Sequence, residues 1–196
     1  MSYSALILAG GRATRMGGED KGLIELFGQP LIGHTLAALA AQTPPPAHIL
    51  ISANRHLDAY RAFGHTVLPD TLPDYAGPLA GLSAALAAAP DDTLLMLPCD
   101  AVRLPADLTA RLLVALESGV DAASVRDPEH WHPTLLALRP GLGAALDAYL
   151  ADGGRAIRGW LATLDHVVVP FDQPLPNLNT PAALAALAAA GPAGLA

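Results

Sequence analysis

Hydrophobic residues in this chain gather in short unbroken runs that alternate with longer stretches of helical periodicity. Unbroken runs are typical of strands that are buried on both faces of a parallel sheet. They occupy residues 3–8, 48–53, 65–68, 93–97, 121–125, 134–138 and 166–171. The helical stretches occupy residues 31–42, 57–63, 79–89, 105–118, 142–151, 156–164 and 180–190. Strands separated by helices of this length predict βαβ units, and hence an α/β fold with a mostly parallel sheet.

Proline and polar residues mark the limits of these elements. Pro30 stands at the first turn of one predicted helix, and Thr180 is the expected N-cap of the last. Residues 22–27 are expected to form a short extended segment. Beyond the helix at 105–118 the alternation is less regular, with an irregular segment at 126–133, so the sheet can gain an antiparallel strand there.

Composition and charge narrow the class of protein. Hydrophobic residues make up 52% of the 196-residue chain, and this length suits one domain over residues 1–190 with a flexible tail at 191–196. A formal charge of −7 disfavours a nucleic-acid binder, which would carry a basic face. The single cysteine, Cys99, cannot form a disulfide within the chain, and neither a signal peptide nor a transmembrane run is visible. We therefore expect a cytoplasmic protein that binds neither nucleic acid nor membranes.

The stretch 8–21 follows the first predicted strand and combines glycine with basic residues. Glycine lets backbone N–H groups approach a ligand closely, and successive N–H groups form an anion-binding concavity. Arginine and lysine add charge and donors for phosphate oxygens. The residues concerned are Gly10, Gly11, Gly17, Gly18, Arg12, Arg15 and Lys21. Because open α/β sheets bind ligands at the carboxyl ends of their strands, this stretch predicts a polyphosphate cradle.

Two familiar phosphate loops do not fit this stretch. A Walker loop ends in Gly-Lys-Ser/Thr, but Asp20 precedes Lys21 and Gly22 follows it. A dinucleotide fingerprint has Gly-x-Gly-x-x-Gly opening a helix, whereas these glycines come in two pairs. Leu-Ala-Gly-Gly at 8–11, Arg-Met-Gly at 15–17 and Lys21 resemble instead the signature loop of sugar-phosphate-type nucleotidyltransferases. That resemblance implies transfer of a nucleoside monophosphate from a triphosphate onto a phosphate.

Asp100 follows the most hydrophobic predicted strand, 93–97. A carboxylate at that strand end points into the same crevice as the stretch 8–21. Transfer between anions needs a divalent cation, and Mg²⁺ is held by one or two carboxylates together with phosphate oxygens. Asp100 is therefore the candidate metal ligand, with a turn or helix-capping role as the alternative. A nucleophilic cysteine needs a base and a lowered pKa, and no sequence neighbour of Cys99 supplies a base, so we interpret Cys99 as structural.

Several other polar positions are candidates with weaker signals. Asp70 suits a ribose, a metal-bound water or a simple turn. Gly81, inside a predicted helix, indicates close approach to a ligand or to a packing neighbour. His130 and His132 share one face if their segment is extended, although two imidazoles alone make a weak metal site. Candidates for anion or heterocycle contacts are Asn177, Asn179, Arg155 and Arg158.

Together these motifs resemble the molybdenum cofactor guanylyltransferase family over nearly the whole chain. The matching pieces are residues 8–18, 20–21, 52–56, 70, 77–81, 97–100, 132–134 and 177–181. The resemblance implies a Rossmann-like three-layer sandwich in a single domain. It also implies transfer of GMP from GTP to the terminal phosphate of molybdenum-molybdopterin, with Mg²⁺ as cofactor and pyrophosphate as the second product. Cofactor-synthesis enzymes and client-specific chaperones are the further partners it suggests.

The motifs and the resemblance assign roles to individual residues. The residues expected to be catalytic are Arg15, Lys21 and Asp100, the last also being the expected metal ligand. The expected nucleotide-binding residues are Leu8, Ala9, Gly10, Gly11, Lys21, Ser52, Asn54, Asp70, Gly77, Pro78, Leu79, Gly81 and Asp100. The expected acceptor-binding residues are Asn177, Asn179 and Arg155. Ser52 stands where relatives can carry asparagine, and it can still donate and accept.

Two alternative functions stay open. A sister enzyme of the same fold would transfer CMP to molybdopterin, or a nucleotide to a sugar phosphate; Gly11 in place of alanine favours guanine. A non-catalytic carrier would bind nucleotide and cofactor without turnover. The presence of both Lys21 and Asp100 argues against a carrier, because binding alone needs fewer charged groups. An attacking phosphate is already anionic, so the enzyme needs positioning and electrostatic stabilisation but no general base.

Overall fold

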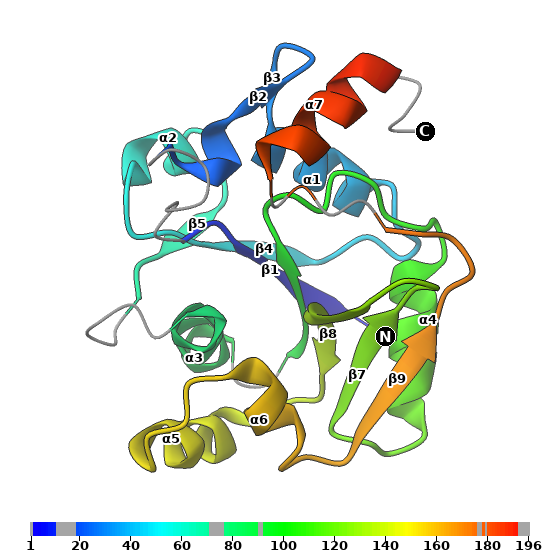
Figure 1. The fold of residues 1–196 in the computed structure, drawn as a ribbon. Coiled ribbons are helices and arrows are strands. Elements are labelled where there is room, and N and C mark those ends of the chain that lie inside the picture. The colour runs from blue at the N-terminus through cyan, green and yellow to red at the C-terminus, as the bar shows by residue number, and fades with distance from the viewer. Residues whose placement is uncertain are drawn as a thin grey trace.

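A seven-stranded sheet runs through the centre of the computed structural model, which describes residues 2–10, 19–70, 77–89, 92–175, 178 and 180–191 (Figure 1). The strand order is β5-β4-β1-β6-β8-β7-β9. The strands are β1 (Tyr3–Leu8), β4 (His48–Ser52), β5 (Thr66–Leu68), β6 (Thr93–Pro98), β7 (Ala122–Arg126), β8 (Trp131–Leu138) and β9 (His166–Pro170). Each neighbouring pair is parallel except those of β8, which runs antiparallel to β6 and β7. The predicted mostly parallel sheet is confirmed.

Helices cover both faces of this sheet, which explains why its strands are unbroken hydrophobic runs. Alternate residues of a strand face opposite sides. Ala5 and Ile7 of β1 belong to the core under one set of helices, and Leu6 belongs to the core under the other. The first set is α1 (Leu31–Ala40), α2 (Leu57–Arg61) and α4 (Leu108–Glu117). The second set is α3 (Pro78–Ala88), α5 (Gly143–Ala151) and α6 (Ile157–Leu161). The predicted three-layer sandwich is therefore confirmed.

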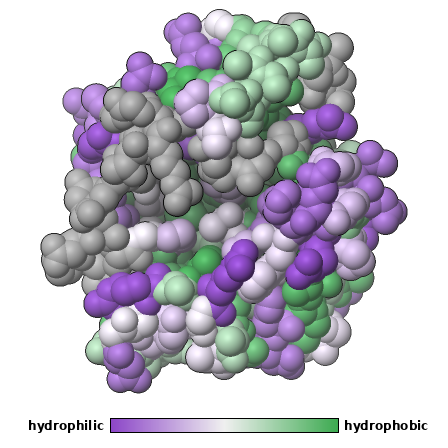
Figure 2. Space-filling view, viewed as in Figure 1, coloured by the Kyte–Doolittle hydropathy of each residue, from purple (hydrophilic) through white to green (hydrophobic). Residues whose placement is uncertain are grey.

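A smaller unit packs at one end of the sheet. It consists of the two-stranded ribbon β2 (Glu25–Leu26) and β3 (Gln29–Pro30) and the C-terminal helix α7 (Pro181–Ala190). Leu184 and Leu187 of α7 pack partly against Leu26, while the rest of the helix presents an apolar surface at the top of the molecule (Figure 2). None of the described helices is long and apolar enough to cross a membrane.

Two elements differ from the sequence-based predictions. The segment 22–27, predicted as extended, begins with a 3₁₀ turn, η1 (Lys21–Leu23). Strand β8 begins at Trp131, inside the segment predicted to be irregular. Hydrophobic periodicity missed this start because His132 and Pro133 separate Trp131 from the predicted run at 134–138. Only Gly191 of the predicted tail lies within the described residues.

The topology brings one set of strand ends together. The carboxyl ends of β1, β4, β5 and β6 lie at the same edge because these strands are parallel. Since β8 is antiparallel to β6, it delivers its first residues, and not its last, to this edge. Ligands of open α/β sheets bind outside the carboxyl ends of the strands, so this edge is where a site is expected.

Candidate functional site

A cavity of about 330 Å³ opens at the carboxyl edge of the sheet. Residues 8–10 and Lys21 line it on the β1 side, and Asp100 lies at the end of β6. On the β8 side the cavity is lined by His132 and Thr134, and Arg103, which follows β6 in the chain, lines it as well. The cavity therefore spans the edge from β1 to β8.

An ion pair joins the two residues that the sequence singled out most strongly. The Lys21 ammonium lies 2.5 Å from Asp100 Oδ2. The Asp100 side chain is 7% exposed and that of Lys21 is 20% exposed. A buried carboxylate needs a compensating charge, and Lys21, the only lysine of the chain, supplies it. The prediction that these two side chains share one site is confirmed by this geometry, while their catalytic roles remain predictions.

Hydrogen bonds to the neighbouring residue Cys99 hold the backbone that carries Asp100. The backbone N–H of Cys99 donates to the Leu8 carbonyl at 3.0 Å, so the end of β6 is tied to the end of β1. The Thr35 hydroxyl donates to the Cys99 carbonyl at 2.8 Å. Cys99 itself is buried, and burial raises the pKa of its thiol, which agrees with the structural role expected for it.

Tyr60 holds the turn that carries Lys21, a role that no sequence pattern indicates. Its hydroxyl donates to Asp20 Oδ1 at 2.5 Å. Burial, followed by the Asp20 carboxylate, raises the pKa of Tyr60 far above its ordinary value, so the phenol stays a neutral donor. A Cβ at Gly22 would lie 2.5 Å from the Tyr60 hydroxyl oxygen. Gly22 thus allows Tyr60 to approach the backbone beside Lys21.

A polar group lies at the ends of β4 and β5. Asn54 Nδ2 donates to Asp70 Oδ2 at 2.6 Å, and the Asp70 N–H donates to Asn54 Oδ1 at 2.8 Å. The Ser52 hydroxyl donates to Asp70 Oδ1 at 3.3 Å. This group adjoins the cavity at Gly10, where a Cβ would lie 3.1 Å from Asn54 Nδ2. Three of the predicted nucleotide-binding residues are therefore brought together as one hydrogen-bonded set.

The start of α3 lies partly at the cavity. Pro78 lines it, and Gly77 precedes the helix with φ +68°, a conformation that favours glycine. The side chain of Leu79 is fully buried in the core, so a contact between Leu79 and the nucleotide could come only from its backbone and remains a prediction. Gly81 is also turned away: a Cβ there would lie 2.3 Å from Ser52 Oγ and 3.1 Å from Leu8 Cδ2. Its glycine serves close packing of α3 on the sheet, and not approach to a ligand.

We expect Gly81→Ala to lower the free energy of unfolding by about 1–3 kcal/mol, the range typical of overpacked cores. The added methyl would also lie 2.8 Å from Ser52 Cβ, so the helix or the strand must shift. Denaturant unfolding measures the effect. Gly143→Ala is the control, because its Cβ would come no closer than 3.9 Å to Leu86 Cβ. Equal stability of the two variants would contradict the packing role.

The remaining predicted residues divide into two groups. Gly11, Arg15, Asn177 and Asn179 lie outside the described residues. Arg155 is described, and its guanidinium donates to the carbonyls of Leu150 and Gly154 at 2.8 and 2.6 Å. It does not line the cavity, so its predicted contact with the acceptor is not supported. The sequence placed it by its neighbouring glycines, but those form the turn after α5.

The donors at the cavity fit a metal ion that arrives with its ligand. Asp100 is the only acidic side chain among the described residues that line it. Nowhere in the described part of the chain do three histidine, cysteine, aspartate or glutamate side chains gather around a potential metal position. One carboxylate matches a hard cation whose other ligands are phosphate oxygens and water.

Comparison with known proteins shows that the chain with this sheet and this ion pair is a nucleotidyltransferase. A family model described as "MobA-like NTP transferase domain" matches residues 5–167. The molybdenum cofactor guanylyltransferase of Shewanella frigidimarina is 47% identical over 181 residues, which cover 90% of this chain and 91% of that protein. The one of Polynucleobacter asymbioticus is 43% identical over 196 residues, covering 96% and 97%. The chain belongs to the molybdenum cofactor guanylyltransferase family.

A solved structure supports the fold. The structure of molybdopterin-guanine dinucleotide biosynthesis protein A from Archaeoglobus fulgidus superposes with a TM-score of 0.76 at 21% identity. The match covers 95% of this chain and 97% of that one. The arrangement of strands and helices is therefore the one adopted by that protein.

Proposed function

We propose that this protein transfers GMP from GTP to the terminal phosphate of molybdenum-molybdopterin, with pyrophosphate as the second product. The observation that carries the proposal is the Lys21–Asp100 pair, in which an ammonium and a single carboxylate meet near the carboxyl ends of β1 and β6. Membership in the guanylyltransferase family supports both substrates.

Different residues along the sheet edge bind the nucleoside, the triphosphate and the metal ion. The backbone of residues 8–10 and the set of Ser52, Asn54 and Asp70 bind the nucleoside on the β1, β4 and β5 side. Lys21 binds the triphosphate, and Asp100 holds Mg²⁺ against it. When bound, Mg²⁺ supplies charge neutralisation and orients the phosphates. Positioning and electrostatic stabilisation account for catalysis, since the attacking phosphate already carries negative charge.

The acceptor occupies the β8 side of the cavity. Leu104 and Leu135 line that side and offer an apolar surface to the ring system of a pterin. Asn177 and Asn179 remain predicted contacts of the acceptor, and Arg15 remains a predicted catalytic residue that holds the triphosphate. Cofactor-synthesis enzymes and client-specific chaperones remain predicted partners, and a cytoplasmic location remains an expectation.

The purified protein should release pyrophosphate from GTP only when Mg²⁺ and molybdenum-loaded molybdopterin are both present. The measurement compares GTP, CTP, ATP and UTP, with omission of the pterin and of Mg²⁺ as controls. Release with CTP in place of GTP would move the protein to the cytidylyl alternative. Binding of GTP without release of pyrophosphate would contradict the enzyme proposal and favour a carrier.

A further inference from the structure

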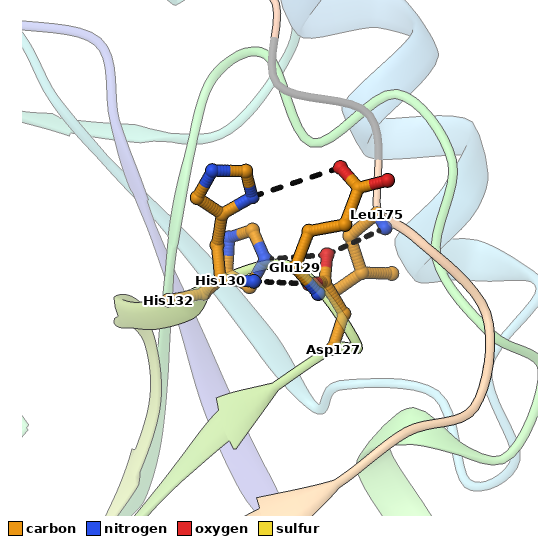
Figure 3. Close-up of polar contacts among 5 residues, drawn as sticks. All are labelled: Asp127, Glu129, His130, His132 and Leu175. Atoms are coloured by element: carbon orange, nitrogen blue, oxygen red, sulfur yellow. Dashed lines mark hydrogen bonds and ion pairs between the residues drawn. The ribbon is translucent and has the colours of Figure 1, made fainter.

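A buried aspartate and a histidine form a hydrogen-bonded pair between β7 and β8 (Figure 3). Asp127 is the first residue of the connecting turn, and His132 is the second residue of β8. His132 Nε2 lies 2.8 Å from Asp127 Oδ2, and the two side chains are 14% and 1% exposed. This pair is separate from the Lys21–Asp100 pair, and the function proposed above assigns it no role.

Asp127 is held as a carboxylate. Burial alone would raise its pKa, but four donors outweigh burial and lower the pKa well below its ordinary range. The donors are the backbone N–H groups of Glu129, His130 and Leu175, at 2.8, 2.6 and 2.9 Å, and the imidazole of His132. A carboxylate only accepts hydrogen bonds, so His132 must carry a proton on Nε2. Asp127 therefore fixes both the orientation and the protonation of that side of the ring.

The other nitrogen of His132, Nδ1, is not buried and has no hydrogen-bond partner among the described residues. Within the described part of the chain, Asp127 is the only hydrogen-bond partner of the ring, and it occupies Nε2. The buried side-chain polar atoms without a partner in that part are Thr109 Oγ1 and Trp160 Nε1. Nδ1 of His132 is not among them, so it is not buried, and His132 lines the cavity. Nδ1 is thus available to a ligand there.

The position of His132 in the sheet indicates which of the two substrates, the nucleotide or the acceptor, it contacts. The strand order places Ser52 and Asp70 on one side of β6 and His132 on the other. Thr134 and Arg103 also line the cavity, and neither side chain makes a hydrogen bond or ion pair with another described residue. An arginine, a threonine hydroxyl and a histidine whose Nδ1 has no partner among the described residues line one cavity, and together they suit a phosphate group. A phosphate bound there would lie on the opposite side of Asp100 from the predicted nucleoside-binding residues.

We propose that His132, oriented by Asp127, binds the phosphate of the acceptor substrate through Nδ1. The inference rests on the proposed transfer of GMP and names a residue for its acceptor side. The Asp127 carboxylate balances the imidazolium form, in which Nε2 donates to Asp127 and Nδ1 donates to a phosphate oxygen. His132 touches the substrate, and Asp127 acts through it as a positioning residue.

Two substitutions separate this role from a structural one. Glutamine extends as far as Nε2, so His132→Gln keeps the hydrogen bond to Asp127 and removes the nitrogen at Nδ1. Asparagine places its amide near Nδ1, so His132→Asn keeps a donor at that position and loses the hydrogen bond to Asp127. His130→Gln is the matched control: this histidine lies in the same turn, its side chain is 62% exposed, and it does not line the cavity.

The experiment measures steady-state pyrophosphate release against molybdenum-loaded molybdopterin at saturating GTP, GTP binding without acceptor, and thermal unfolding. We expect His132→Gln to raise the KM for molybdopterin about tenfold or more, the effect of losing one charge-assisted hydrogen bond. Its GTP affinity and unfolding temperature should match those of the wild type. His132→Asn should recover part of the acceptor affinity while unfolding at a lower temperature, and His130→Gln should behave as wild type.

Two failures can be told apart. Wild-type activity with an unchanged molybdopterin KM in His132→Gln would overturn this inference alone. It would leave the histidine as a clamp for the turn, particularly if His132→Asn were the impaired variant. Absence of acceptor-dependent turnover in the wild type would overturn the proposed function, and the inference with it.

Asp127 is tested through the same histidine. Asp127→Asn should raise the molybdopterin KM in the wild-type background with little change in GTP affinity. In the His132→Gln background the same substitution should give no further rise, because the contact it supports is already gone. Independent, multiplying effects of the two substitutions would contradict a positioning role.

Discussion

Alanine in place of Asp100 is expected to abolish pyrophosphate release while leaving the protein folded. Asp100 is the only carboxylate among the described residues lining the cavity, so its removal takes away the proposed protein ligand of the metal. A bound metal contributes several kcal/mol of transition-state stabilisation, which corresponds to a loss on the order of 10³-fold or more. The fold should survive because the Lys21 side chain is 20% exposed and can turn its ammonium toward water.

Three variants make this test specific. Asp100→Asn keeps the shape and removes the charge, so it should be nearly as inactive as Asp100→Ala at ordinary Mg²⁺ concentrations. Asp107→Asn is the matched control, because Asp107 is 60% exposed and only 3.6 Å from Arg111 in a surface pair of small energetic value. Activity, GTP binding and thermal unfolding are measured for each. Near-normal turnover by Asp100→Ala with Mg²⁺ present would remove Asp100 from the metal role.

The convergence of Lys21 and Asp100 could be predicted from the sequence, because it depends on a rule that local patterns satisfy. Two unbroken hydrophobic runs, 3–8 and 93–97, indicate parallel strands, and the residues that follow such strands meet at one edge. The structure places β1 beside β6 with Leu8 opposite Pro98. The chemistry of the two side chains then follows from where the strands end.

The contacts that hold the site could not be predicted, because they join residues that are distant in sequence. Tyr60 and Asp20 are separated by 40 positions and meet only because α2 packs against the same face as η1. Gly81 carries no signal that separates approach to a ligand from approach to Ser52, since both require the absence of a Cβ. Which of the two applies depends on the direction in which α3 presents that position.

His132 shows a third reason why the role of a residue could not be predicted from the sequence. The pattern His-x-His suggested two imidazoles acting alike, and their rings do lie 6.3 Å apart. Their environments differ, because Asp127 accepts from the ring of one histidine and from the backbone N–H of the other. The reversal of β8 relative to β6 then brings the first of these to the cavity. Strand direction beyond residue 118 was the weakest part of the sequence-based prediction, and the role of this segment depends on it.

Alanine in place of Lys21 is expected to lower kcat/KM by about 10²-fold or more, as does removal of one charge-stabilising donor in other active sites. The substitution should also destabilise the free protein by up to about 3 kcal/mol, because it leaves the Asp100 carboxylate buried without its partner. Because Lys21 is proposed to bind the triphosphate, addition of GTP with Mg²⁺ should raise the unfolding temperature of Lys21→Ala less than that of the wild type.

Matched variants separate the charge of Lys21 from its length. Lys21→Met keeps most of the chain length and should lose as much activity as Lys21→Ala, whereas Lys21→Arg should retain part of it. Because Lys21 is the only lysine of the chain, an amine-specific reagent modifies one side chain besides the N-terminus. Mass spectrometry should show that GTP with Mg²⁺ protects this side chain from modification. Two outcomes would place the triphosphate elsewhere in the cavity. One is a loss of activity below about threefold in Lys21→Ala, because a lost charge-stabilising donor costs far more. The other is equal labelling of Lys21 with and without GTP.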